Sequence, residues 1–286
     1  MERPADGRVL PVLSIVIPAN NEADYIGSCL DALLSQNRVE APVEVIVAAN
    51  ACSDGTVEIV RGFGPRFESL GWSLVLLDLQ EPGKPNALNS ADAVASYPGR
   101  LYLDADVVMM PDLLAEICRA LADDKPVYCG GRLIVAPATS WMTRRYSEVW
   151  SRLPFMTSSG VTGAGLFAVN AEARKRWAVF PEIISDDTYV RLHFSPEERI
   201  ALSSGYLWPM VEGFSALVKV RRRQDAGLAE IAQKYPQLLA NDGTRKMRFF
   251  DHLSLFSSSP ISYLIYVGVA LAVRSREPEK AWTRGR

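Results

Sequence analysis

The chain has 286 residues, of which 48% are hydrophobic and 22% are charged, and its net charge is −2. This length is sufficient for one large or two small domains with a sizeable core, and the composition is typical of a globular protein. The near-neutral charge excludes the signature of a nucleic-acid-binding protein. Basic residues nevertheless outnumber acidic ones within 215–250 and 274–286. We therefore expect acidic ligands or a phospholipid surface as partners of the C-terminal region.

The cysteines, at positions 29, 52, 118 and 129, form no Cys-x-x-Cys pair and show no zinc-binding spacing. The N-terminal stretch has no apolar signal segment, and we expect a reduced, cytoplasmic protein. The longest apolar segment, 260–273, is shorter than the roughly 18 residues of a membrane-spanning helix. Two predictions remain open for it. It forms either a buried C-terminal helix or a helix that lies peripherally on the inner face of the cytoplasmic membrane.

Short apolar runs alternate with amphipathic segments in the first part of the chain. The apolar runs predict buried strands at 12–17, 43–48, 72–79 and 100–104. Pro18 is expected to end the first strand, and a helical pattern follows each of the first three strands. This alternation indicates βαβ units. We therefore expect an α/β fold with a mostly parallel, Rossmann-like sheet and helices on both faces.

Beyond residue 125 the alternation is lost. The sequence predicts a longer strand with a Gly-Gly bend at 126–137 and an amphipathic, aromatic helix at 140–153. A glycine-rich turn then leads into a strand within 160–170, and a further helix begins at Asp186. We expect an α/β domain over residues 1–215, followed by a basic helical C-terminal region over 216–286.

Two aspartates, Asp104 and Asp106, follow the fourth predicted strand with only Ala105 between them. Alternation along an extended segment places both carboxylates on the same side. Two like charges so close are costly unless a cation lies between them, and hard divalent cations share oxygen ligands with phosphates. The pair predicts a site for a metal-bound diphosphate. The alternative is that Asp106 caps a turn before the helix that Pro111 opens.

Polar residues also follow the first strand, and loops after parallel strands gather at the carboxyl edge of a sheet. Asn20, Asn21 and Glu22 come directly after Pro18. Their backbone amides and short side chains are candidates for holding a base or a ribose. Helix capping by Asn21 is the alternative interpretation.

The second and third strands are followed by similar candidates. Asn50 and Asp54 flank a turn, for which a capped loop is the alternative. Lys84 stands at the start of a helix, where an anion also interacts favourably with the helix dipole. Lys84 is therefore a candidate for pairing with a phosphate, unless it is only a solvated lysine.

A fourth segment carries two adjacent acids, Asp186 and Asp187, in the first turn of a predicted helix that Ser185 can cap. Acidic residues stabilise a helix N-terminus, which is one interpretation. The other is that an aspartate in a cleft serves as a general base and takes a proton from an attacking hydroxyl.

In order and spacing these segments resemble the motifs of the inverting family-2 glycosyltransferases, which have the GT-A fold and use nucleotide-diphospho-sugars. That family has Pro-x-x-Asn-Glu, an Asp/Asn-rich turn ending in Asp-Gly-Thr, Gly-Lys-x-x-Ala-Leu-Asn, Asp-x-Asp, and Glu-Asp. The matching segments here are Pro18 to Glu22, Asn50 to Thr56, Gly83 to Asn89, Asp104 to Asp106, and Asp186 with Asp187. The resemblance covers about two-thirds of the chain, residues 12–195.

The resemblance implies a role for each matching residue. Asp187 would be the catalytic base, and Asp106 with Asp104 would bind Mn²⁺ or Mg²⁺. Gly163, Gly165 and Asp186 would lie on the acceptor side. The nucleotide-sugar would be bound by the residues Pro18, Asn20, Glu22, Asn50, Asp54, Lys84 and Asp104.

Three departures from the family pattern bear on function. Ala48 and Ala49 stand where many members have an aspartate that recognises the base, and Asp186 replaces the usual glutamate. The Gln-x-x-Arg-Trp motif of processive synthases is absent. In place of that motif, the segment 220–227 contains Arg222 and Arg223, which would bind the diphosphate or a membrane surface. The absence of that motif favours addition of a single sugar over polymerisation.

The sequence therefore predicts a metal-dependent inverting glycosyltransferase that acts in polysaccharide or glycolipid synthesis. Its expected partners are a nucleotide-diphospho-sugar donor, a glycan or lipid-linked acceptor, a membrane surface and a second copy in a homodimer, with no nucleic acid. One alternative is a sugar nucleotidyltransferase, although 17–24 lacks the glycine-rich basic loop typical of that class. Another is an inactive nucleotide-binding or interaction protein, against which the retention of Asp106 and Asp187 argues.

Overall fold

The four apolar runs form neighbouring strands in the computed structural model, which describes residues 12–37, 39, 41–158 and 160–275. They are β1 (Leu13–Ala19), β2 (Val43–Asn50), β3 (Ser73–Leu79) and β4 (Gly99–Leu103). β1 pairs in parallel with β2 and with β4, and β2 pairs in parallel with β3. The predicted parallel α/β arrangement is thus confirmed for this part of the chain.

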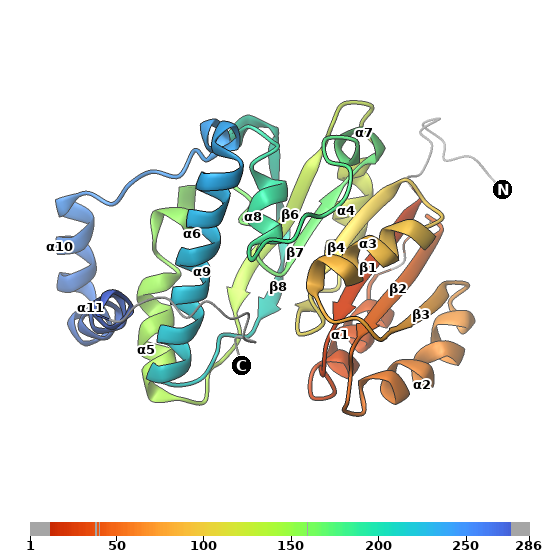
Figure 1. Cartoon of the computed structure of the whole chain (residues 1–286), viewed down its shortest axis with the longest axis horizontal. Helices are drawn as coiled ribbons and strands as arrows, with labels where there is room; N and C mark the ends of the chain where they lie inside the picture. Colours follow the sequence, from red (N-terminus) through yellow and green to blue (C-terminus); the bar gives the residue numbers. More distant parts are fainter. Residues whose placement is uncertain (1–11, 38, 40, 159, 276–286) are drawn as a thin grey trace. The chain divides into compact units, whose positions relative to one another are not determined.

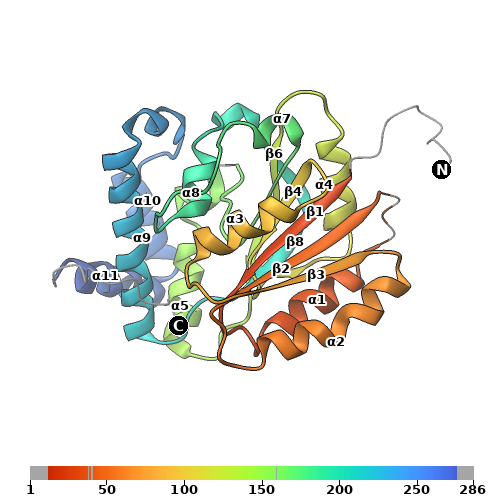
Figure 2. The same cartoon turned by 45° about the vertical axis from the view of Figure 1, so that its right-hand side comes forward.

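Helices cover both faces of these strands. Figure 2 shows α3 (Lys84–Val94) across one face of β1 and β2, while α1 (Ile26–Leu34) and α2 (Thr56–Ser69) lie together at the other. This division follows from right-handed crossovers, because the chain moves one way along the sheet through β1, β2 and β3 and then returns to β4. The carboxyl ends of β1, β2 and β4 thereby meet at one edge.

Antiparallel strands extend the sheet beyond β4. β7 (Leu166–Val169) pairs with β4, β6 (Tyr128–Val135) pairs with β7, and the short β5 (Val108–Met109) pairs with β8 (Arg199–Trp208). Within the described residues the sheet has eight strands, in the order β3-β2-β1-β4-β7-β6-β8-β5. The core lies between the sheet and α1, α2 and α4 (Leu113–Leu121), with Ile15, Val45 and Leu101 fully buried.

Two boundaries differ from the sequence-based expectation. Pro18 does not end β1, which continues to Ala19 in register with β2. The pairing of β1 with β4 ends at Val16, so the missing N–H of Pro18 interrupts no ladder on that side. The first helix begins at Ile26 and not at the polar segment after β1, so Asn21 is not its N-cap.

The chain divides into two compact units. Unit 1 runs to Ile134 and includes Gly163–Glu182 and Glu197–Trp208, so it contains the sheet. Unit 2 comprises Val135–Thr162, Ile183–Pro196 and the chain from Pro209 onward. Residues 135–162 and 183–196, which the sequence analysis groups with the first domain, therefore belong to unit 2.

Unit 2 consists of helices, which Figure 1 shows in green and blue. They are α5 (Trp141–Trp150), α6 (Pro154–Ser158), α8 (Asp186–Arg191), α9 (Phe214–Lys234), η2 (Pro236–Asn241), α10 (Phe249–Ser258) and α11 (Pro260–Arg274). The short α7 (Ala171–Arg174) belongs to unit 1, and η1 (Pro196–Glu198) joins the two units.

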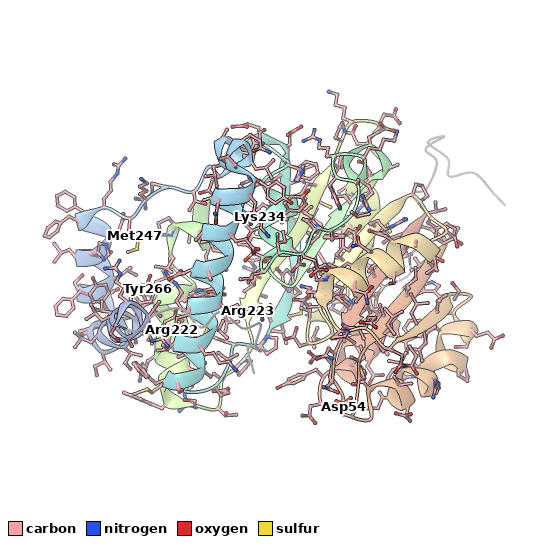
Figure 3. The ribbon with its side chains drawn as sticks, in the orientation of Figure 1. Asp54, Arg222, Arg223, Lys234, Met247 and Tyr266 are labelled. Atoms are coloured by element: carbon pink, nitrogen blue, oxygen red, sulfur yellow. The ribbon has the colours of Figure 1, made fainter. Side chains whose placement is uncertain are left out.

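The apolar segment 260–273 forms α11, which packs against α5, α9 and α10. Tyr266, labelled in Figure 3, packs against Tyr146 of α5 with ring centroids 5.6 Å apart and ring planes tilted by 32°. Ser262 Oγ donates a 2.6 Å hydrogen bond to Glu148, and Arg222 donates to the carbonyl oxygens of Ala272 and Val273. One side of α11 is therefore buried, as one of the two predictions expected.

The other side of α11 is exposed, and none of the helices between residues 12 and 275 is both long and apolar enough to cross a membrane. The N-terminal stretch before residue 12 and the basic tail after residue 275, on which the sequence analysis also drew, lie outside the described residues.

Candidate active site

Hydrogen bonds join three loops at the carboxyl edge of the parallel strands. The Asn20 side-chain amide donates to the Asn50 and Ala51 carbonyl oxygens, at 2.6 and 3.2 Å. Asn50 Oδ1 in turn accepts a 2.9 Å hydrogen bond from the Gly83 backbone N–H, directly before α3. Asn20 and Asn50, both predicted to lie around a nucleotide, thus fix the relative positions of the loops that follow β1, β2 and β3.

The first two loops are joined at further points. Asn21 Oδ1 accepts from the backbone N–H and hydroxyl of Ser53, and the Glu22 N–H donates to Thr56 Oγ1. Asn21 and Ala51 have positive φ angles of 52° and 47°, which L-residues rarely adopt. Such backbone conformations persist only where surrounding contacts hold them. The two loops therefore form one ordered structure.

Asp54, labelled in Figure 3, lies in the turn before α2. Its carboxylate accepts hydrogen bonds from the Ala23 N–H and from both the N–H and the hydroxyl of Thr56. Desolvation, the largest single influence, acts to raise the pKa of Asp54, but the hydrogen bonds together outweigh it and hold the pKa below its usual value. Asp54 thus stays ionised and ties the start of α2 to the loop after β1.

Lys84 and Asp104 form an ion pair at the same edge. Lys84 Nζ lies 2.9 Å from Asp104 Oδ1, and the two side chains are 29% and 34% exposed. The start of α3 thus places a positive charge against the Asp104 carboxylate. Burial is the main cause that raises the pKa of the Cys29 thiol, and the charges of Asp104 and Glu22 act in the same direction.

Asp106 is almost fully buried, with 8% of its surface exposed, and it stands between β4 and β5. The helix that follows, α4, is not opened by Pro111 as expected, because it begins at Leu113 with Asp112 before it. The Asp104 carbonyl oxygen accepts the Val107 N–H at 3.1 Å, which turns the chain between the two strands. Asp106 is therefore held in a fixed turn beside the Lys84–Asp104 pair.

The glycine-rich turn before β7 lies against Asp104. The Asp104 N–H donates to the Gly165 carbonyl oxygen at 2.8 Å, and Tyr206 Oη donates to the Ala164 carbonyl oxygen at 2.6 Å. Gly163 and Gly165 have φ angles of 78° and 74°. A Cβ at Gly165 would lie 2.7 Å from the Trp208 ring. Of the two predicted acceptor-side glycines, Gly165 is thus bound directly to Asp104.

The donor set at this edge fits a hard divalent cation. Asp104 and Asp106 offer carboxylate oxygens, and Mg²⁺ and Mn²⁺ bind through one or two carboxylates together with phosphate oxygens. The described residues contain no group of three or more His, Cys, Asp or Glu side chains placed to hold a metal ion. Asp106, with Asp104 beside it, is the place where a metal that brings its own phosphate ligands would bind.

Unit 2 carries the other two predicted acids at the start of α8. Asp186 is buried, and Asp187 is partly exposed with its Oδ1 accepting the Thr188 N–H at 2.6 Å. Ser185 precedes the helix, but its hydroxyl makes no capping hydrogen bond, contrary to the expectation. Of the two carboxylates, Asp187 is the one that solvent or a ligand can reach.

Helix α9 holds the start of α8. Glu230 Oε2 accepts the Ile184 N–H at 2.9 Å, while Glu230 Oε1 lies 2.7 Å from Lys234 Nζ. Desolvation acts to raise the pKa of Glu230, but the hydrogen bonds from Lys234 and Ile184 lower it below its usual value. Gly227, one turn earlier, is buried against Ser185. These two α9 residues set the position of the Asp186–Asp187 turn.

The two arginines of α9 labelled in Figure 3 differ in their surroundings. Arg222 is bound to the C-terminal carbonyls of α11, so it holds two helices together. Arg223 is partly exposed, and the described contacts include no ion pair for it. Of these two, Arg223 remains the candidate for binding an anion.

Sequence reasoning did not identify Gly227 and Glu230, which contact the segment before α8, or Trp208, which packs on the glycine-rich turn before β7. Gly227 stands inside a helical pattern, where an isolated glycine often has a packing reason, and that signal was available. The contacts of Glu230 and Trp208 join segments that are far apart in the sequence, and no local pattern indicates them.

Comparison with known proteins gives the family. The model for glycosyl transferase family 2 matches residues 14–169, which is more than half of the chain. Glycosyltransferase AglE of Haloferax volcanii is 35% identical over 97 residues, which cover 34% of this chain and 31% of that protein. The chain spans a third or less of the length of several curated relatives that it matches.

Solved structures show the same fold. The mannosyltransferase PcManGT from Pyrobaculum calidifontis, in complex with GDP-Man and Mn²⁺, aligns with a TM-score of 0.58 and 20% identity, covering 94% of this chain and 77% of that one. Glucosyl-3-phosphoglycerate synthase from Mycobacterium tuberculosis, in complex with Mn²⁺, UDP and glucosyl-3-phosphoglycerate, aligns with a TM-score of 0.51 and 18% identity over 86% of this chain and 88% of that one. The chain has the GT-A fold and belongs to glycosyl transferase family 2.

Proposed function

We propose that this chain transfers a single sugar from a nucleotide-diphospho-sugar to an acceptor hydroxyl, with inversion at the anomeric carbon. The observation that carries the proposal is the contact between Lys84 and Asp104 beside the buried Asp106. A lysine and two carboxylates at the carboxyl edge of a parallel sheet are suited to a metal-bound diphosphate. The lysine would pair with the negative phosphates, and the carboxylates would pair with the positive metal ion.

On the donor side, Lys84 and the N-terminus of α3 face the negative charge of the diphosphate. Asp104 then stands between Lys84 and the ribose or the metal.

The loops around the nucleotide are fixed by Asn20, Asn50 and Asp54, since their described hydrogen bonds run between those loops. Pro18 and Glu22 belong to the same loop region, and Arg223 is the further candidate for the phosphates.

Ala48 and Ala49 are fully buried in β2. Their methyl side chains have no polar atom that could bind the base. The relative PcManGT is bound to GDP-Man, and the mycobacterial synthase is bound to UDP. Donors of both classes therefore belong in the test of this chain.

In the reaction, the acceptor oxygen attacks the anomeric carbon while the bond from that carbon to the diphosphate oxygen breaks. The leaving nucleoside diphosphate keeps the electron pair, and the Asp187 carboxylate takes the acceptor proton. Asp106, with Asp104, would hold a Mn²⁺ or Mg²⁺ ion, which when bound would supply electrostatic stabilisation of the leaving diphosphate. Lys84 contributes in the same sense, because its charge is fixed at the edge of the sheet before the bond breaks.

The acceptor in this proposal is a glycan or a lipid-linked sugar. The GT-A fold serves many acceptors, and the similarity to the chondroitin synthase of Pasteurella multocida supports a glycan acceptor. Asp186 and the Gly163–Gly165 turn are assigned to the acceptor side.

The test is a panel of UDP-, GDP- and dTDP-sugars, each incubated with the full chain and either Mn²⁺ or Mg²⁺. Thermal stabilisation by one nucleotide class identifies the donor, because a ligand that binds only the native state raises stability. Transfer to a glycan acceptor, followed by NMR of the new anomeric centre, tests inversion. A product that retains the anomeric configuration excludes the single displacement assigned to Asp187, and binding without hydrolysis or transfer across the panel excludes catalysis.

A further inference from the structure

Helix α10 carries a row of exposed aromatic and aliphatic side chains. Phe249 and Phe250 are 75% and 77% exposed, and Leu253 and Phe256 follow at spacings of one and two helical turns, at 51% and 45%. Such spacings place these side chains on one side of the helix. Leu255, at an intervening position, is buried. The exposed stripe of α10 is thus apolar, although it faces solvent.

Helix α11 is apolar on two sides. Tyr266 and Val269 belong to its buried side, which packs in unit 2, whereas Ile261, Leu264 and Leu271 are 57–60% exposed on the opposite side. A helix that is apolar all round normally finds an apolar environment on every side. α10 and α11 pack together, and together their exposed side chains form what we call the α10–α11 apolar face.

Basic residues flank this face. Arg245, Lys246 and Arg248 directly precede α10, and Arg274 ends α11. Between residues 244 and 275 the sequence contains one acid, Asp251, and both of its carboxylate oxygens are bound by the Arg245 guanidinium at 2.7 and 3.0 Å. The face is therefore apolar at its centre and positively charged at its edge.

We propose that the α10–α11 apolar face docks onto the surface of a lipid bilayer that contains anionic headgroups. Amphipathic helices with aromatic and leucine residues on one side and basic residues beside them bind such surfaces in the plane of the interface. Aromatic rings are favoured at the boundary between headgroups and acyl chains. The flanking basic residues match anionic headgroups, which attract each Lys or Arg near the surface.

Charge also favours a bilayer over a second copy of the chain. Two copies that paired through this face would bring identical basic flanks together, and the one acid of the segment is already bound to Arg245. A face that remained in water would be a large exposed apolar surface, which soluble proteins rarely keep without a partner. The inference goes beyond the proposed transferase activity, and it holds or fails independently of that activity.

The experiment is co-sedimentation of the full-length chain with phosphatidylcholine vesicles and with vesicles that also contain phosphatidylglycerol. We expect binding to the anionic vesicles at low salt, and strong weakening in 1 M salt, where the screening length is about 3 Å. Lys246→Gln should weaken binding about fivefold, the effect of one basic residue near the surface. The double variant Phe249→Ser/Phe250→Ser should lose binding.

Leu253 and Leu228 provide a matched pair, because each is 51% exposed and only Leu253 belongs to the face. Leu253→Ser should weaken vesicle binding, whereas Leu228→Ser on α9 should leave it unchanged. Circular dichroism spectra and thermal melting curves that match those of the native chain verify that each variant is folded. Failure of the native chain to bind anionic vesicles at low salt overturns the proposal. So does equal binding to both vesicle types, or self-association that Phe249→Ser/Phe250→Ser abolishes in the absence of vesicle binding.

Discussion

Gly227 of α9 lies so close to Ser185 that a Cβ at position 227 would overlap the Ser185 hydroxyl. Ser185 directly precedes the two aspartates of α8, and the Ile184 N–H beside it is bound to Glu230 of α9. The position of Asp187, the proposed base, therefore requires that position 227 of α9, about one turn before Glu230, has no side chain.

Gly227→Ala should displace the start of α8 and lower kcat, on the order of 10²-fold if the Asp187 carboxylate shifts by about 1 Å. Steady-state kinetics with the identified donor provide the measurement. Gly64→Ala in α2 is the control, because a Cβ there meets nothing within 4 Å and alanine favours a helix. Equal kcat values for Gly227→Ala and the native chain would contradict the positioning role of α9.

Asp187→Asn keeps the shape of the side chain but removes its basicity. We expect turnover to fall roughly 10²–10⁴-fold with little change in donor affinity, as for the loss of a general base. The comparison variant is Asp186→Asn, which should lower turnover less, and because Asp186 is buried its effect should appear in the melting temperature. A loss confined to donor affinity in Asp187→Asn would assign this residue to binding.

Asp106→Asn should remove the metal-dependent part of nucleotide binding and leave the fold intact. The measurement is the melting temperature with UDP or GDP, in the presence and absence of Mn²⁺. Asp124→Asn is the control, because Asp124 is an exposed aspartate in the turn after α4. If Mn²⁺ still strengthens nucleotide binding in Asp106→Asn, the metal assignment is wrong.

Gly165→Ala combines an unfavourable backbone conformation with overlap. The φ angle of 74° disfavours alanine, and the new Cβ would lie 2.7 Å from Trp208 and 2.9 Å from Val107. We expect the free energy of unfolding to fall by about 2–4 kcal/mol, measured by denaturant titration. Gly71→Ala separates the two causes, because Gly71 has a φ of 72° and a Cβ there would meet nothing within 4 Å. This variant should therefore lower the free energy of unfolding only through the unfavourable backbone conformation.

The hydrogen bonds of Asp54 predict a pH-dependent contribution to stability. Its pKa is lower in the folded chain than the ordinary value of 3.8, so its carboxylate contributes stability in full above that value. The contribution is lost as the pH falls through the lower folded pKa. The difference in melting temperature between the native chain and Asp54→Asn should be constant above about pH 5 and shrink toward pH 3. A difference that grows on acidification would contradict the assignment.

The parallel part of the sheet was predictable because its strands are buried on both sides. A strand such as Val43–Asn50, which is buried throughout, appears in the sequence as a continuous apolar run bounded by polar turns. Pro18 shows the limit of such patterns. Proline commonly ends a strand, but here β1 has lost its neighbour β4 before Pro18 and continues with β2 alone.

The candidate site was predictable in composition, while its internal contacts were not. The sequence supplies Lys84 and Asp104 as separate candidates, and their 2.9 Å contact depends on how α3 crosses the sheet. Similarly, the fit of Gly227 against Ser185 depends on the packing of α9 against the start of α8, and the two residues are 42 positions apart in the sequence (227 − 185). Local patterns report which residues line a strand end or a helix start, whereas these pairings arise only from the tertiary fold.

The hydrogen bonds between the loops after β1 and β2 have a consequence for how the protein can change. The Ser53 N–H donates a hydrogen bond to the Asn21 side chain, and the Ala23 N–H donates one to Asp54. Replacing the acceptor residue in one loop therefore leaves a donor of the other loop without its partner. Altered nucleotide preference is therefore expected to arise through paired replacements within 20–23 and 50–56. A loop transplanted from a relative should retain activity only when its partner loop is transplanted with it.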